Sequence, residues 1–194
     1  PDASATKTLT IRPSLTATPS FGVSVAASFF SGPAIFQFKG AKHVIIDGRR
    51  GGVGSTRAMV IFHTNFSLQS PVVFFHQGAE YNELKYCIIK SCTSNFPEVY
   101  IVDATNITIN NNLVTDAADM GIPQKPRTGV YGSGTATFIS SNNVVTDNHF
   151  SNQLISGVEL ANQCDEWTIS GNRIFQTTAR LVSPNTYGIL IQSG

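Results

Sequence analysis

Acid–base chemistry is the first function that individual residue types suggest, through His76 and Asp103. Each closes a short apolar segment, residues 72–76 and residues 99–103. If the two segments are neighbouring strands, the imidazole and the carboxylate lie roughly one strand spacing apart. A carboxylate beside an imidazole tunes the imidazole pKa for proton transfer. The pair lacks a third partner, so a structural role stays open beside the catalytic one.

Two cations, Lys125 and Arg127, stand in the most distinctive insertion of the chain, residues 121–129. Their positive charge could hold an acidic polysaccharide by ion pairing. The alternative is a solvated loop that its two prolines stiffen.

Paired carboxylates and metal ligands give a weaker signal. Glycosidases need two carboxylates roughly 5–10 Å apart, and the close acidic pairs are Asp116 with Asp119 and Asp165 with Glu166. Both pairs fall in expected turns, where solvated acids are common. No repeat position stacks several carboxylates for Ca²⁺, and none of the three cysteines has zinc-site spacing. We therefore expect no cofactor and no metal, although a calcium site stays open.

The elements that would position these side chains form a repeat. Short apolar strands, each followed by a polar bend, recur around six equivalent residues: Ile11, Ile46, Leu84, Ile109, Val145 and Ile169. A second apolar strand precedes most of them and begins at residues 34, 72, 99, 129, 157 and 188. The two series advance together, which indicates stacked coils.

Stacked coils bury an apolar face that no single coil could bury alone. We therefore predict an all-β fold, a single-stranded right-handed parallel β-helix (a solenoid) of about six coils. Asn112, Asn148 and Asn172 fall at one repeat position, where stacked amides could form a structural ladder. An antiparallel sandwich is the alternative fold, but hairpin signals between adjacent strands are missing.

Two outward columns of the second strand series could contact a ligand. Counting two residues from each start gives Phe36, Phe74, Ile101, Tyr131, Glu159 and Leu190; counting four gives Phe38, His76, Asp103, Ser133, Ala161 and Gln192. Aromatic rings stack on sugar rings, so Phe36, Phe74 and Tyr131 are candidate carbohydrate-binding residues, with Glu159 accepting hydroxyl hydrogen bonds. A register error of one residue exchanges inside for outside. Loops could also cover the first column.

Charge and hydropathy exclude several classes. The chain of 194 residues has 13% charged residues and a net charge of +1, without the basic face that nucleic-acid binding needs. No apolar run is long enough for a membrane helix. Thirteen Phe residues and the Val/Ile runs argue against disorder.

The segments AIFQFKGAKHVIIDGR (34–49), VYIVDATNITINNNLVTD (99–116) and GVELANQCDEWTISGNRIFQ (157–176) resemble the repeat of the pectin-lyase-like superfamily of right-handed parallel β-helices. The resemblance covers residues 8 to 194. It implies the fold but not one activity, since this superfamily includes polysaccharide lyases, glycoside hydrolases, phage tailspikes and adhesin-like surface proteins. Its lyases often use Lys or Arg as the base.

We expect one domain over residues 1–194, an internal piece of a longer solenoid, because neither end shows a capping helix. The leading hypothesis is an extracellular or cell-surface module for adhesion, carbohydrate contact or scaffolding. Its partners would be a polysaccharide or surface glycan and the rest of the parent chain. A polysaccharide lyase or glycoside hydrolase is the alternative, with His76, Asp103, Lys125 and Arg127 as catalytic candidates. A filament component built by end-to-end stacking is a third hypothesis.

Overall fold

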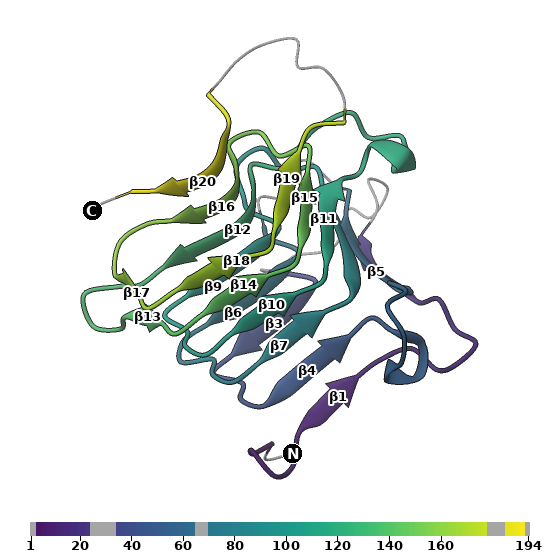
Figure 1. Ribbon diagram of the computed structural model, residues 1–194, viewed down its shortest axis with the longest axis horizontal. Coiled ribbons are helices and arrows are strands. Elements are labelled where there is room, and N and C mark those ends of the chain that lie inside the picture. Colours follow the sequence, from purple (N-terminus) through teal and green to yellow (C-terminus); the bar gives the residue numbers. More distant parts are fainter. Residues whose placement is uncertain (1–2, 24–33, 65–69, 178–184, 193–194) are drawn as a thin grey trace.

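A computed structural model describes residues 3–23, 34–64, 70–177 and 185–192 of the chain. Within these ranges the chain winds through three parallel sheets of six strands each, so that every coil contributes one strand to each sheet. Figure 1 shows the coils stacked along the sequence, from β1 to β20. The parallel β-helix predicted from the repeat is therefore confirmed.

The strands of the three sheets follow one another in fixed order along the chain. The first sheet contains β1 (Leu9–Ile11), β4 (Val44–Asp47), β7 (Glu83–Lys85), β10 (Thr108–Asn110), β14 (Val144–Thr146) and β18 (Thr168–Ser170). The second contains β2 (Ser20–Val23), β5 (Met59–His63), β8 (Cys87–Ser91), β11 (Leu113–Asp116), β15 (His149–Ser151) and β19 (Arg173–Phe175). The third contains β3 (Phe36–Lys39), β6 (Val73–His76), β9 (Val99–Val102), β12 (Thr128–Ser133), β16 (Ser156–Leu160) and β20 (Tyr187–Ile191).

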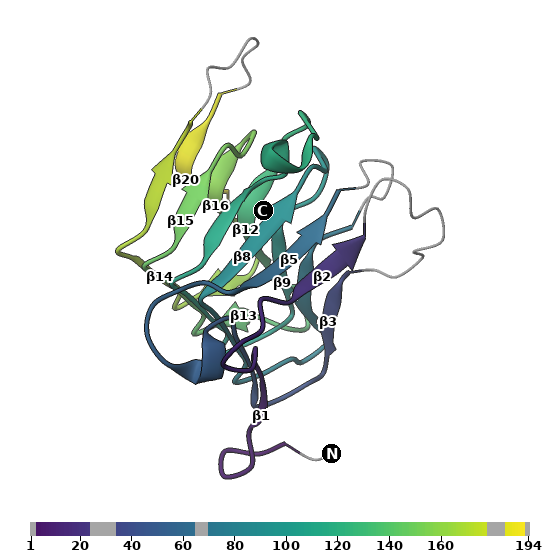
Figure 2. The same ribbon diagram turned by 90° about the vertical axis from the view of Figure 1, so that its right-hand side faces the viewer.

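Shorter elements lie in the connections between sheets. A two-stranded sheet pairs β13 (Ser140–Ser141) with β17 (Cys164–Asp165), and the 3-10 turns are η1 (Arg50–Gly52) and η2 (Ala118–Met120). Figure 2 shows the second sheet as a separate face of the solenoid. The polar bend that the sequence predicts after each first-sheet strand is the corner at which the chain passes into the second sheet.

The core is a set of apolar columns that run along the solenoid axis. The first sheet contributes Ile46, Leu84, Ile109 and Val145 to one column, in which each residue is paired in register with the next. All four are fully buried. The second and third sheets add equivalent columns, so the interior fills with branched aliphatic and aromatic side chains.

The bend between the first and second sheets depends on two consecutive positions. Asn111, Asp147 and Gly171 have positive φ angles of 56°, 56° and 65°. These residues turn the chain, because Asn, Asp and Gly adopt the left-handed region at low cost. The asparagines of the predicted ladder stand one residue later and do not have positive φ, so left-handed geometry is not the reason for their position.

The three ladder asparagines are joined by side-chain hydrogen bonds. Asn112 Nδ2 donates to Asn148 Oδ1, and Asn148 Nδ2 donates to Asn172 Oδ1, both over 3.1 Å. The same carboxamide oxygens accept the backbone amides of Asn112 and Asn148 over 2.9 Å. Each amide therefore satisfies buried backbone groups that the bend removes from the strand ladders.

A second group of asparagines, missed by sequence analysis, supports the bend between the third and first sheets. Asn82 Oδ1 accepts the Val44 amide over 2.9 Å, and Asn143 Oδ1 accepts the Ile107 amide over 2.8 Å. Asn143 is fully buried and Asn82 nearly so. Both bends thus use buried carboxamides to satisfy the backbone of the preceding coil.

The ladder gives a stability prediction. Asn148→Ala removes the acceptor for Asn112 and leaves buried backbone carbonyls without their donor, so we expect a loss of roughly 2–4 kcal/mol in the free energy of unfolding. Urea unfolding followed by circular dichroism measures it. Asn162→Ala, at an exposed asparagine, is the matched control and is expected to change stability by less than about 0.5 kcal/mol. Equal losses in both variants would contradict the role of the ladder.

Candidate functional site

The outer face of the third sheet carries one aromatic column. Its register places Gln37, Phe74, Tyr100, Tyr131, Glu159 and Leu190 side by side on successive coils. Phe74, Tyr131, Glu159 and Leu190 occupy the predicted column. Phe36 and Ile101 do not, because the register at these two strands differs by one residue.

Both displaced residues belong to the interior. Ile101 is fully buried in the core. Phe36 packs against the core and makes an edge contact with Phe21, with ring centroids 5.6 Å apart. Tyr100 is the aromatic residue that sequence analysis missed, although the alternation in residues 99–102 could have shown it.

Phe74, Tyr100 and Tyr131 form a continuous aromatic strip. The Phe74 and Tyr100 rings stack with centroids 5.1 Å apart, and Tyr131 meets Tyr100 edge-on at 5.2 Å. All three side chains are half-buried, with part of each ring open to solvent. Burial raises the pKa of both tyrosines, so their hydroxyls stay protonated at neutral pH.

Arg127 lies against the end of this strip, where Glu159 holds it. Arg127 Nη2 donates to Glu159 Oε1 over 2.9 Å, and the guanidinium carbon lies 5.8 Å from the Tyr131 ring centroid. Glu159 is almost fully buried and also accepts from Thr128 Oγ1 over 2.9 Å and Gln192 Nε2 over 3.1 Å. With these three hydrogen bonds, Glu159 positions Arg127 and does not present a free carboxylate to a ligand.

A shallow pocket opens beside Arg127 and the two tyrosines. Its volume is about 200 Å³, and it is lined by Asn95, Phe96, Pro97, Tyr100, Arg127 and Tyr131. The Arg127 side chain is 32% exposed, so the guanidinium faces solvent as well as Glu159. Aromatic walls and one fixed cation suit a ring-sized polar ligand that has hydroxyl or anionic groups.

His76 lies at the other end of the strip. Its imidazole stacks on Phe74, with centroids 4.1 Å apart, and Gln37 Nε2 donates to His76 Nε2 over 2.7 Å. Burial lowers the pKa of His76 and nearby Lys39 lowers it further, while Asp103 acts in the opposite direction. His76 is therefore neutral near pH 7, with Nε2 as an acceptor.

Asp103 is close enough to His76 to influence its charge, but it is not its strand partner. The register pairs Phe75 with Ile101, so Asp103 falls one residue beyond the position beside His76, and it follows β9 with a φ of 51°. Phe38, predicted in the same outward column, is 5% exposed and stacks on Phe75 inside the core. Asp103 Oδ1 is buried and has no hydrogen-bond partner within the described part of the chain.

The side chains of Lys125 and Arg127 contact different sheets. Lys125 Nζ lies 3.5 Å from Asp116 Oδ2, and Asp116 ends β11 in the second sheet. Asp119 pairs with Lys90 on that same sheet. These two aspartates are thus neutralised by lysines, and the structure brings only Arg127 of the two loop cations to the aromatic strip.

The remaining candidate residues lie in β17, in the bend after it and at the ends of third-sheet strands. Asp165 and Glu166 are both exposed, but only Glu166 lies in the predicted turn, because Asp165 is the last residue of β17. The Glu166 amide donates to Asp165 Oδ1 over 2.9 Å. Ser133, Ala161 and Gln192 follow one another at the end of the third sheet, and Gln192 contacts Glu159. Among the residues that the structure describes, no group of three or more His, Cys, Asp or Glu side chains could hold a metal ion.

Glu98 anchors the loop that forms one wall of the pocket. It directly follows Pro97, is fully buried, and accepts from Gln153 Nε2 over 2.9 Å. Its backbone amide donates to the Thr128 carbonyl over 2.9 Å. Burial raises the pKa of Glu98 well above its ordinary value of 4.5, and the nearby charge of Asp116 raises it further.

Replacing this buried acid should change how stability depends on pH. Folded Glu98 keeps its proton at pH values where the unfolded chain has lost it, so its contribution to stability falls as pH rises above about 4.5. We expect the stability of Glu98→Gln relative to the native chain to increase progressively as the pH rises above 4.5. Urea unfolding at several pH values measures this. Glu166→Gln, in the exposed turn, is the control, and a pH-independent difference for Glu98→Gln would refute the assignment.

The described residues contain no helix with the length and hydrophobicity that a membrane span requires. Comparison with curated proteins finds no matching sequence. A family model described as the right-handed β-helix region matches residues 53–194, which is most of the chain and includes the aromatic strip. Together with the three parallel sheets, this match shows that the chain belongs to the right-handed β-helix family.

Proposed function

We propose that this protein is a carbohydrate-binding β-helix module that holds a glycan chain along the outer face of the third sheet. The observation that carries the proposal is the aromatic strip of Phe74, Tyr100 and Tyr131 on three successive coils. A pyranose ring presents an apolar face of C–H groups, which packs on an aromatic face, while its hydroxyls point sideways to polar partners. A row of rings spaced by the strands can contact an extended oligosaccharide at several points.

Arg127 supports the same surface. Held by Glu159, it can donate N–H groups to a hydroxyl or a carboxylate of a sugar in the adjoining pocket. Because the folded protein already holds this long side chain in place, binding loses less side-chain conformational entropy. The proposed setting is extracellular or at a cell surface, with adhesion or scaffolding as the role of the larger protein.

A second candidate function is polysaccharide cleavage, as a lyase or a glycoside hydrolase. The observation that favours it is the proximity of neutral His76 to Asp103 at one end of the aromatic strip. An imidazole Nε2 that accepts a hydrogen bond is in the protonation state of a general base. Lys125 is not part of this candidate site, because it pairs with Asp116 on the second-sheet side.

Binding is tested by removing one ring at a time. We expect Tyr131→Ala and Tyr100→Ala each to weaken binding about 5- to 30-fold, the equivalent of about 1–2 kcal/mol of stacking and buried ring area. The measurement uses an immobilised panel of neutral and acidic polysaccharides, followed by calorimetry on the tightest member. Tyr100→Phe keeps the ring and should bind nearly as the native chain does.

Phe138→Ala is the matched control, since Phe138 is exposed in the loop between β12 and β13 and is not part of the strip. It should leave affinity unchanged. The proposal fails if the folded native chain binds no member of the panel. It fails equally if loss of Tyr131 and loss of Phe138 have the same effect.

Cleavage is tested with the same panel, by following new reducing ends and the ultraviolet absorbance of unsaturated uronates. If the native chain turns over a polysaccharide, we expect Asp103→Asn to lower kcat at least about 100-fold while binding is kept. Turnover that Asp103→Asn leaves intact would remove the His76–Asp103 pair from the mechanism. Lys125→Ala is the control that should not change kcat.

A further inference from the structure

An inserted loop, residues 49–57, leaves the solenoid at the corner between the first and second sheets, after β4 and before β5. Gly48 closes its base, because the Gly48 carbonyl accepts the backbone amide of Ala58 over 2.8 Å. The loop therefore lies outside the stack of coils. Arginines stand at both of its ends, Arg49 and Arg57, and their side chains reach the corners of the coils that follow.

The two arginines differ in whether a carboxylate compensates their charge. Arg49 lies over the Tyr86 ring, 4.4 Å from its centroid, and donates from Nη2 to Asp47 Oδ2 over 2.6 Å. Arg57 reaches one coil further, where its Nε donates to the Asn111 carbonyl over 2.6 Å. Burial lowers the pKa of Arg57, and only Tyr86 acts in the opposite direction. Arg57 is thus a half-buried cation, held through Nε, that forms no ion pair within the described chain.

His149 brings a second basic group to this corner. It begins β15 on the outer face of the second sheet, in register with Leu113 on one side and Arg173 on the other. Leu113 comes two residues after Asn111, whose carbonyl holds Arg57. Burial lowers the pKa of His149, and the positive charges of Arg57 and Arg173 lower it further. The three basic side chains are therefore close enough for their charges to interact.

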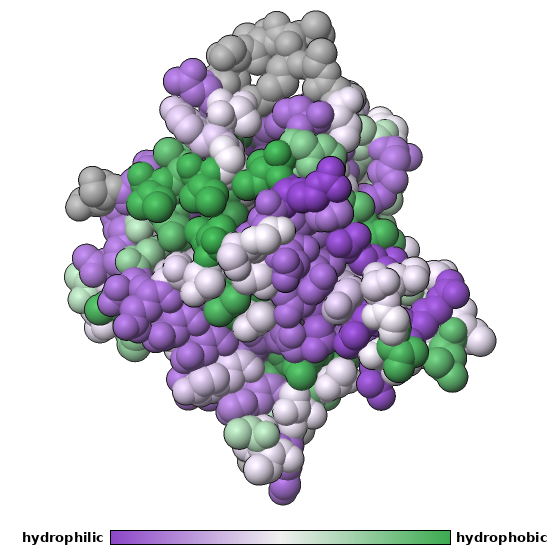
Figure 3. Space-filling view, in the orientation of Figure 1, coloured by the Kyte–Doolittle hydropathy of each residue, from purple (hydrophilic) through white to green (hydrophobic). Residues whose placement is uncertain are grey.

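The acidic side chains of the described residues leave this corner uncompensated. Asp147 comes two residues before His149, but its Oδ1 lies against Gly171, where a Cβ would be only 2.2 Å away. None of the ion pairs in the described ranges includes Arg57 or His149. Both residues belong to coils that have a described coil on either side. Figure 3 shows a largely hydrophilic surface around the place where Figure 1 puts the beginnings of β15 and β19.

We propose that Arg57 and His149, flanked by Arg173, bind an oxyanion group: a sulfate, a phosphate or a carboxylate. The two Nη groups of a guanidinium fixed through Nε match two oxygens of such a group. An imidazole N–H of His149 donates to the same group, and protonation of the ring adds a second positive charge. The anion in turn supplies the opposite charge that the half-buried Arg57 lacks. The site lies at the corner between the first and second sheets, so the inference does not depend on glycan binding at the third.

The pKa of His149 in the whole chain, measured by proton NMR, tests the site. The His149 ring signals are those that His149→Asn removes. We expect sodium sulfate to raise this pKa by about half a unit or more relative to sodium chloride at equal ionic strength, because a bound anion stabilises the imidazolium. Sulfate affinity should accordingly increase as the pH falls from about 8 to about 6. Arg57 and Arg173 are the charged groups that act on His149, and neither titrates in this range.

Phosphate and acetate, compared with chloride in the same way, show which oxyanions the site accepts. A sulfated or uronate-containing oligosaccharide that acts at a lower concentration than the free ions identifies a polymer as the source of the anion. A response no stronger than that to the free ions identifies a small anion instead. Either result supports the site, because both require an oxyanion beside His149.

Removal of single arginines tests which side chains bind the anion. Arg57→Gln should weaken sulfate binding at least about 10-fold, because it removes the bidentate donor. Arg50→Gln is the matched control and should bind sulfate as the native chain does. It removes the same charge from the same loop, but Arg50 donates to the Ala17 carbonyl over 3.3 Å. Arg173→Gln, at an exposed residue, should weaken binding about two- to five-fold and keeps the test valid if Arg57→Gln does not fold.

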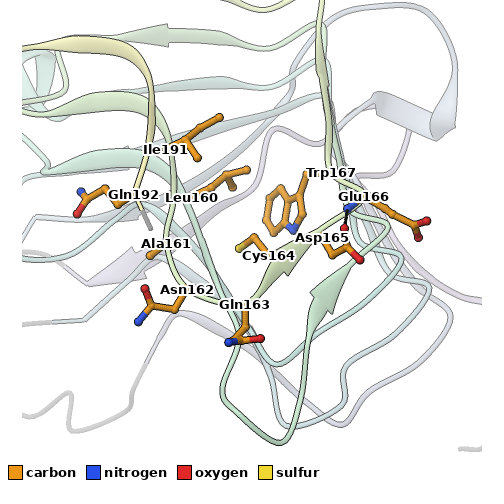
Figure 4. A pocket seen from close by; sticks show the side chains of 10 residues that line it. All are labelled: Leu160, Ala161, Asn162, Gln163, Cys164, Asp165, Glu166, Trp167, Ile191 and Gln192. Carbon is orange, nitrogen blue, oxygen red and sulfur yellow. Dashed lines mark hydrogen bonds between the residues drawn. The ribbon is translucent and has the colours of Figure 1, made fainter. Parts of the chain in front are cut away.

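Trp167, the only tryptophan of the chain, reports whether each variant is folded. Figure 4 shows Trp167 beside Cys164, and its Nε1 donates to the Ser140 carbonyl over 2.8 Å. Its fluorescence in each folded variant should match that of the native chain, because Trp167 lies between the third and first sheets, at a different corner. The proposal is overturned if sulfate changes the pKa of His149 no more than chloride does. It is overturned equally if Arg57→Gln and Arg50→Gln bind sulfate with the same affinity.

Discussion

In-register parallel pairing between neighbouring coils is the constraint on which the rest of this molecule depends. No coil buries its own apolar face, so each inward side chain must meet an inward side chain of the next coil at the same height. Ile46, Leu84, Ile109 and Val145 do so in the first sheet and are fully buried. Because pairing is in register, bends must also fall at the same height, and their backbone groups need partners there.

The asparagine ladder follows from that requirement. At the bend between the first and second sheets the chain turns over one left-handed residue, and the next amide points inward, where neither water nor a strand can satisfy it. A buried carboxamide on the following coil supplies the acceptor, as Asn148 does for Asn112. Since the carboxamide also donates, one residue type satisfies both sides. The same solution at Asn82 and Asn143 satisfies backbone amides at the other bend.

Much of the fold could be predicted from sequence because two apolar series advance together, but the outward column could be predicted only in part. The predicted column counts from the expected strand starts at residues 34, 72, 99, 129, 157 and 188. Two apolar residues precede the first strand position at Phe36, one precedes Val73, and none precedes Val99. Apolar residues that precede these strands, such as Ala34 and Val72, are buried as well. Hydrophobicity alone therefore does not show at which residue the inward and outward alternation of the strand begins. The count was correct at Phe74, Tyr131, Glu159 and Leu190, and it failed at Phe36 and Ile101.

The two ends of the aromatic strip differ in whether their charged side chains have partners on neighbouring coils. Glu159 accepts three hydrogen bonds, and one of them holds Arg127, so this end has a fixed geometry. A guanidinium held in this way can orient a ligand. At the other end His76 accepts a hydrogen bond while uncharged, and one buried oxygen of Asp103 lacks a partner in the described chain. A buried carboxylate oxygen that has no hydrogen-bond partner lowers the free energy of unfolding. In the proposed function, ligand binding therefore relies on the Arg127 end of the strip, and the second candidate function assigns proton transfer to the His76 end.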